Sequence, residues 1–135
     1  MFSVMSLLRP AVAAAVLLAG CLSAQAAAEF PFGQEVTLDV APQPGSKRVP
    51  TLEFGSSGET RIDLWCKHGK GQFSVAGNTV IFVPGVMDAA GCTPARAQAD
   101  DELLAALGAA TNWTRQVDSL SFSGGKPLRF FLNLN

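Results

Sequence analysis

The sequence contains no tyrosine, a single histidine and few charged residues, and each scarcity argues against a class of function. Lys, Arg, Asp and Glu make up 16% of the 135 residues, and the formal net charge is −1. The charges are scattered and form no basic stripe, so the electrostatic footprint of a nucleic-acid-binding protein is missing. The one histidine, His68, cannot complete a zinc site alone. We therefore expect no metal, no cofactor and no nucleic-acid partner.

Motifs that mark common enzyme classes are also missing from the sequence. Gly69-Lys70-Gly71 lacks the spacing of a phosphate-binding P-loop, and no serine lies in a GxSxG nucleophile elbow. A paired-carboxylate hydrolase needs two acids in one cleft, whereas the acidic residues here fall mostly at outward-facing or helix-capping positions. The sequence therefore predicts a protein that is not an enzyme.

The N-terminus has the features of a secretory signal peptide. Arg9 supplies the positive charge, residues 10–20 form a short apolar run, and small residues follow. We interpret residues 1–26 as a signal peptide and residues 27–135 as a single exported domain. No second apolar stretch approaches the ~20 residues of a transmembrane helix, so a membrane is reached only through the N-terminus.

Two cleavage sites compete within this segment. Residues 18–21 (LAGC) resemble the lipobox of bacterial lipoproteins, which predicts removal of residues 1–20 and lipidation of Cys21. Alternatively, Ala24-Gln25-Ala26 resembles the small-x-small site of ordinary signal peptidase, and cleavage there would release a free periplasmic protein. Several acyl chains anchor a protein stably. We therefore predict either an outer-membrane lipoprotein, held only through Cys21, or a periplasmic protein.

Two cysteines, Cys66 and Cys92, remain once Cys21 is lipidated or removed. Two cysteines in an oxidising compartment most simply pair, and a disulfide closing a loop of this size stabilises a domain by roughly 3–4 kcal/mol. Neither cysteine lies in a Cys-x-x-Cys motif, which argues against redox or metal chemistry. We expect a structural disulfide, with two free thiols as the alternative.

Alternation of apolar and polar residues predicts a mostly β domain. Val36, Leu38 and Val40 share one face of the first strand, and Ile62, Leu64 and Cys66 share the core face of the third. Residues 79–83 (TVIFV) are apolar on both faces, which predicts a buried central strand. We predict strands at residues 35–40, 49–54, 60–66, 72–75, 79–83, 113–117, 120–122 and 128–132, with loops at 67–71 and 84–96.

One helix is expected between the fifth and sixth strands. It starts around Asp100 or slightly earlier and ends near residue 110, with Asp100 or Asp101 as its cap and Leu103, Leu104 and Leu107 on its apolar stripe. The predicted fold class is α+β and mostly β. It is an antiparallel, partly closed sheet or small barrel with one α-helix packed across it.

This order of elements, with the motifs inside it, resembles the META domain, the HslJ-like family of bacterial envelope proteins. The resemblance covers roughly residues 36–134. Residues 50–54 (PTLEF), Trp65-Cys66-Lys67 and Gly71-Gln72-Phe73 match the family's first motifs. Residues 78–83, 88–92 and 102–104 match the later ones, and residues 120–122 and 128–132 match the closing strands. In the family's two cysteine motifs, Lys67 replaces an asparagine and Asp88 replaces a threonine.

The resemblance implies a non-enzymatic binding or accessory domain associated with envelope stress and integrity. Its partner would be an envelope protein or ligand. The possible binding surface comprises Trp65, Lys67, His68 and Asp88, although an exposed loop histidine and a core-filling tryptophan are the plainer interpretations of two of them. The alternative is a secreted inhibitor of the lysozyme-inhibitor type, a small disulfide-bonded β-barrel. Such inhibitors insert a loop with Ser and Tyr, and the missing tyrosine argues against this alternative.

Overall fold

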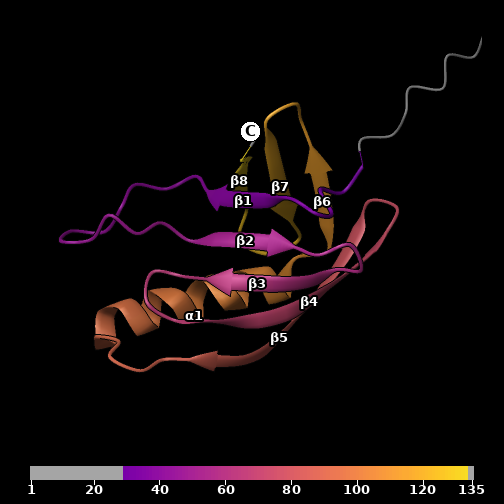
Figure 1. Cartoon of the computed structure of the whole chain (residues 1–135). Helices are drawn as coiled ribbons and strands as arrows, with labels where there is room; N and C mark the ends of the chain where they lie inside the picture. Colours follow the sequence, from indigo (N-terminus) through magenta and orange to yellow (C-terminus); the bar gives the residue numbers. More distant parts are fainter. Residues whose placement is uncertain (1–28, 134–135) are drawn as a thin grey trace, which may run out of the picture.

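The chain folds into a closed antiparallel β-barrel, which the computed structural model describes for residues 29–133 (Figure 1). Each strand pairs with the next one along the chain, and the last strand pairs back onto the first. The strands are β1 (Glu35–Leu38), β2 (Thr51–Phe54), β3 (Glu59–Asp63), β4 (His68–Ala76), β5 (Thr79–Asp88), β6 (Asn112–Arg115), β7 (Ser119–Ser123) and β8 (Leu128–Leu132). The helix α1 (Pro94–Ala109) connects β5 to β6. The predicted fold class is confirmed, and the sheet takes the barrel form.

The barrel interior is filled by the apolar members of the alternating strands. In β8, Leu128, Phe130 and Leu132 are buried, whereas Arg129 and Phe131 between them are exposed. Phenylalanine dominates the centre, because Phe54, Phe73, Phe122 and Phe130 are among the largest fully buried side chains. Their rings make edge-on and stacked contacts with centroids 5.1–5.8 Å apart, the arrangement that aromatic rings favour.

Phe30, in the segment before β1, closes one end of this aromatic core. Its ring centroid lies 4.9 Å from that of Phe54 and 5.3 Å from that of Trp113, and only 5% of the residue is exposed. The indole Nε1 of Trp113 donates to the carbonyl of Gly77 at 2.9 Å, which ties β6 to the β4–β5 turn. The domain therefore includes the chain from at least Phe30 onward.

The helix packs beside the shortest strand pairing of the barrel. β5 and β6 share a single residue pair, Thr79 with Asn112, whereas β4 and β5 pair over most of their length. Between β5 and β6 the chain forms α1, which buries Leu103, Ala106 and Leu107 against the core. The helix thus packs where the ladder of backbone hydrogen bonds is shortest, alongside β5 (Figure 1).

The helix begins well before the predicted start, so the prediction that Asp100 or Asp101 caps it was wrong. Thr93 is the N-cap, its Oγ1 accepts a hydrogen bond from the Arg96 N–H at 3.4 Å, and Pro94 is the first helical residue. Proline suits this position because its missing N–H would have no intrahelical partner there. Asp100 consequently lies inside the helix on its buried face.

The boundaries of β1, β3, β4 and β5 also differ from the predictions. β4 begins at His68 and β5 continues to Asp88, so residues 68–71 and 84–88 are strand and not loop. β3 ends at Asp63, and Cys66 is half-buried in the following turn instead of facing the core from a strand. β1 ends at Leu38, and Val40 beyond it is 41% exposed.

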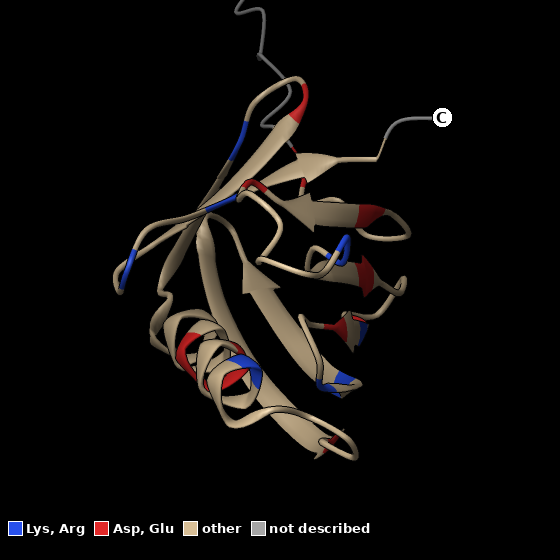
Figure 2. Ribbon diagram, turned by 90° about the vertical axis from the view of Figure 1, so that its left-hand side faces the viewer, with Lys and Arg blue, Asp and Glu red and all other residues tan. Residues whose placement is uncertain are grey.

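The strand predicted to be buried on both faces has one exposed face. Val80 and Phe82 point into the barrel, but Ile81 is 65% and Val83 57% exposed. A β-barrel wall has only one inner face, so a run of apolar residues does not imply two covered sides here. Among the described residues no helix is long and apolar enough to cross a membrane. Acidic and basic residues are scattered along the ribbon in Figure 2 and do not gather on one element.

Candidate functional site

The turn between β3 and β4 is held by a buried side chain, a carboxylate and a disulfide. Leu64 at its start is completely buried, and its backbone N–H donates to the carbonyl of Lys67 at 2.8 Å. The side chain of Leu64 therefore fixes one end of the turn in the core. The three residues Trp65, Cys66 and Lys67 then pass over the buried face of α1.

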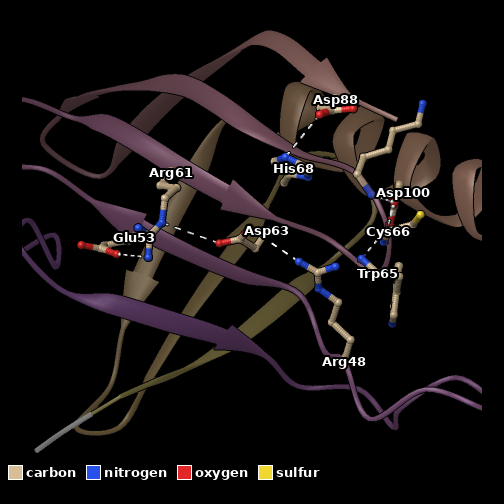
Figure 3. A network of polar contacts seen from close by, with 10 residues as sticks. Arg48, Glu53, Arg61, Asp63, Trp65, Cys66, His68, Asp88 and Asp100 are labelled. Carbon is tan, nitrogen blue, oxygen red and sulfur yellow. Dashed lines mark hydrogen bonds and ion pairs between the residues drawn. The ribbon is translucent and has the colours of Figure 1, made fainter. Parts of the chain in front are cut away.

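Asp100 of α1 holds this turn through its carboxylate (Figure 3). Its Oδ1 accepts the backbone N–H of Trp65 at 2.9 Å, and its Oδ2 accepts those of Cys66 at 3.0 Å and Lys67 at 2.7 Å. Asp100 is fully buried. A buried carboxylate is tolerated when its oxygens are satisfied, and three converging N–H groups supply those bonds. The pairing makes the conformation of the turn depend on the position of the helix.

A disulfide between Cys66 and Cys92 makes a second link between the same two elements, with the Cα atoms 5.6 Å apart. Cys92 directly precedes Thr93, the N-cap of α1. The turn is therefore joined covalently to the start of the helix and by hydrogen bonds to Asp100, two turns further on. This double attachment explains how a short irregular segment keeps one conformation.

Two contacts between basic and acidic side chains flank the attached turn. Lys67 Nζ contacts Asp101 Oδ1 at 2.6 Å, and the Lys67 side chain is only 17% exposed. His68 Nε2 lies 3.5 Å from Asp88 Oδ2, and both side chains are more than half exposed. These two residues are direct cross-strand partners at the end of the β4–β5 ladder. Exposed pairs of this kind contribute little to the stability of the fold. The side chains of His68 and Asp88 are therefore accessible to a partner and are not needed to hold the strands together.

A third polar feature in Figure 3 is a ladder of alternating charges on the outer surface of β2 and β3. Asp63 contacts both Arg48 at 3.8 Å and Arg61 at 3.7 Å, and Arg61 contacts Glu53 at 2.9 Å. The side chains are 35–62% exposed. We interpret this ladder as a solvated face of the sheet.

A small groove lies beside the turn, between α1 and the rim of the barrel, and has a volume of about 180 Å³. Trp65 forms part of its wall, together with the end of β1, the start of β8 and one face of the helix. Its lining residues are Leu38, Asp39, Val40, Trp65, Ala99, Glu102, Leu103, Ala106, Lys126, Pro127, Leu128 and Arg129. The groove combines an apolar interior with charged residues, which is the usual character of a small-ligand site.

A wider hollow of about 880 Å³ lies where Phe30 closes the barrel. Glu29, Phe30 and Phe32 line it together with Trp113 and Arg115, among others. Its walls thus include the first described residues, next to the part of the chain that the structure does not describe.

The four residues proposed from the sequence as a binding surface fall into two groups, one on each side of the turn. Lys67, His68 and Asp88 follow the turn onto the ends of β4 and β5, with Lys67 and His68 each paired to an acidic residue. Trp65 lies at the other side of the turn, in the wall of the groove, where it packs against the core. Cys21, the predicted lipidation site, lies outside the described residues.

Sequence reasoning named Asp100 only as a helix cap and missed its role in holding the turn. The signal was available in Thr93-Pro94, an N-cap followed by proline, which marks a helix start. From that start, Asp100, Leu103 and Leu107 fall on one helical face. A carboxylate on an apolar stripe indicates a buried acceptor. The groove residues of β1 and β8, in contrast, have no local signal in the sequence, because only closure of the barrel brings them together.

Comparison with known proteins gives a family and a fold. The model of the META domain family matches residues 27–134. No curated protein matches the chain significantly. A solved structure titled "NMR structure of the protein" is similar over 74% of this chain and 89% of its own, with a TM-score of 0.54 and 14% identity. At that identity the likeness concerns the fold alone, and it agrees with the barrel described above.

Proposed function

Because this chain belongs to the META domain family, we propose that it is an exported accessory domain of the bacterial envelope that binds a partner without catalysis. The observation that carries the proposal is the Cys66–Cys92 disulfide. Disulfides persist in oxidising compartments such as the periplasm and are rare in the cytosol. The signal-like N-terminus and the family's envelope association point to the same compartment.

The partner surface that we propose is the attached turn and the strand ends beside it. The turn is fixed by a disulfide and a buried carboxylate, and a fixed surface loses little conformational entropy on binding. Lys67, His68 and Asp88 offer hydrogen-bonding groups of both signs within this small area. Among residues 29–133 no group of three or more His, Cys, Asp and Glu could hold a metal ion. These hydrogen-bonding groups on a fixed backbone support the proposed role in recognition.

Site-specific photocrosslinking in living cells tests this proposal. A photoreactive amino acid replaces His68 in one strain and Ser74 in another. Both side chains are exposed on β4, but Ser74 lies farther along the strand, opposite Ile81. We expect a discrete crosslinked species in the envelope fraction from position 68 and none from position 74. Identical patterns from both positions, or recovery of the protein in the cytosol, would contradict the proposal.

The lysozyme-inhibitor alternative stays a prediction from size, compartment and disulfide. The β-barrel is compatible with it, but no described contact favours it. An inhibition assay with purified oxidised protein and lysozyme decides between the two, because an accessory domain of the kind proposed here leaves lysozyme activity unchanged.

A further inference from the structure

Some polar groups in the walls of the groove beside Trp65 have partners within the protein, and others have none. Its acidic residues are engaged: Asp39 faces Arg129 at 3.9 Å, and Glu102 accepts from Gln98 at 3.4 Å. Its donors are not all engaged. Among residues 29–133, Lys126 has no ion-pair partner, and the indole Nε1 of Trp65 is buried without a hydrogen-bond acceptor. Two donors of the groove walls, the Lys126 ammonium and the Trp65 indole N–H, therefore have no acceptor among the described residues.

An unsatisfied buried N–H is costly, because the donor has lost water and gained no acceptor. The backbone N–H of Trp65 is fixed on Asp100 at 2.9 Å, so the turn cannot easily move away to relieve that cost. A ligand that brings an acceptor to the indole N–H relieves it. Because Nε1 is buried, an acceptor in the groove reaches it only after the indole ring turns this edge toward the groove.

The apolar interior of the groove limits the size and character of the ligand. Leu38, Leu103 and Leu128 are at least nine-tenths buried and line it, and Ala99 and Ala106 keep the helix side shallow. The volume is about 180 Å³. An apolar cavity of roughly 150 Å³ holds one benzene molecule. The groove therefore has room for an apolar group the size of one aromatic ring with one or two further carbons.

We propose that the groove binds a small amphiphilic carboxylate, with an aromatic or short aliphatic body in the apolar part and its anionic head near Lys126 and the Trp65 indole N–H. The carboxylate supplies acceptors for the two donors that lack them. Asp39 and Glu102 already have partners within the protein, so neither is left to pair with a cationic ligand. This inference deepens the proposed function, since it takes the domain to be a binding module, but it does not depend on export.

Tryptophan fluorescence and calorimetry test the proposal with 3-phenylpropanoate as the probe. The exported protein, with its disulfide closed, carries Trp113→Phe so that Trp65 is the reporter; Trp113 lies in the barrel core and does not line the groove. We expect saturable binding with a Kd below about 1 mM, as for an efficient ligand of this size. The matched alcohol, 3-phenylpropan-1-ol, should bind at least about fivefold more weakly because it lacks the charge.

Matched variants locate the binding. Ala99→Leu fills the groove and should weaken binding about tenfold or more, whereas Ala105→Leu, on an exposed position of the same helix, should leave it unchanged. Lys126→Met removes an exposed charge without touching the core and should weaken binding about fivefold, which keeps the test valid if Ala99→Leu fails to fold.

Three results would overturn the assignment. These are no saturable binding, equal affinity for acid and alcohol, or equal effects of Ala99→Leu and Ala105→Leu. A peptide with a C-terminal phenylalanine that binds about tenfold more tightly would also overturn it in favour of a protein partner. Failure of carboxylate binding leaves the crosslinking result at His68 intact, so the two proposals fail separately.

Discussion

Replacement of Asp100 by alanine is the most informative single perturbation of this fold. The substitution removes the acceptor of three backbone N–H groups, those of Trp65, Cys66 and Lys67, at 2.7–3.0 Å. A hydrogen bond to a charged group contributes about 1.5–3 kcal/mol, so independent bonds would sum to roughly 5–9 kcal/mol. They are not independent, because the part-buried turn regains some water when the carboxylate is lost. We expect Asp100→Ala to lower the free energy of unfolding by about 3–5 kcal/mol.

The assay is urea denaturation of the oxidised protein, with Asp101→Ala as the matched control. Asp101 is the next residue of the helix, is 62% exposed and makes one ion pair with Lys67, so its replacement should cost no more than about 1 kcal/mol. Asp100→Asn should lie between the two, since an amide keeps one acceptor oxygen and turns a donor toward the remaining N–H. The corresponding fall in Tm for Asp100→Ala is roughly 12–20 °C.

Either of two outcomes would refute the reasoning about this turn. If Asp100→Ala costs less than about 1 kcal/mol, or no more than Asp101→Ala, the three short contacts do not fix the turn on the helix. A loss concentrated in the m-value instead of the midpoint would place the effect in the denatured state. Circular dichroism of each variant before denaturation establishes that the starting states share the native fold.

Two further predictions concern the other constraints on the chain. The double substitution Cys66→Ala/Cys92→Ala should lower the free energy of unfolding by about 3.5 kcal/mol, for a separation of 26 residues. When it is combined with Asp100→Ala, the total loss should differ from the sum of the separate losses by about 1 kcal/mol, because both links hold one turn. Gly58→Ala should cost about 3 kcal/mol or more, since Gly58 has a φ of +86° and a Cβ there would overlap the carbonyl oxygen of Phe73. Gly77→Ala, at a φ of +58° with open space around it, should cost only about 1 kcal/mol. Equal losses at the two glycines, or strict additivity at the disulfide, would contradict these assignments.

The sequence predicted the order of all the described elements because strand alternation and turn residues are local signals. The Gly77-Asn78 turn and the alternating residues of β8 are examples: each is visible in a few consecutive residues. Boundaries were less accurate where two signals competed. The acidic residues at 100–102 suggested a helix start, but Thr93-Pro94 sets it. The deciding contacts of Asp100, with a turn more than thirty residues earlier, are not local.

The candidate site was only partly predictable for the same reason. Cys66 and Cys92 could be paired in advance because two thiols in an oxidising compartment have one obvious partner each. Trp65 could be singled out, but the groove beside it joins β1, α1 and the β7–β8 turn, which only the closed barrel brings together. The exposure of Ile81 and Val83 likewise depends on which face of β5 points into the barrel. A run of apolar residues gives no information about that choice.

The intact mass of the protein extracted from native envelopes, with and without reduction before alkylation, tests the central claim most directly. An exported disulfide-bonded domain predicts a mass that begins at Cys21 with acyl chains or at Ala27 without them, and no alkylation of Cys66 and Cys92 until the protein is reduced. A mass that begins at Met1, with both cysteines alkylated at once, would contradict export and remove the main support for an envelope function.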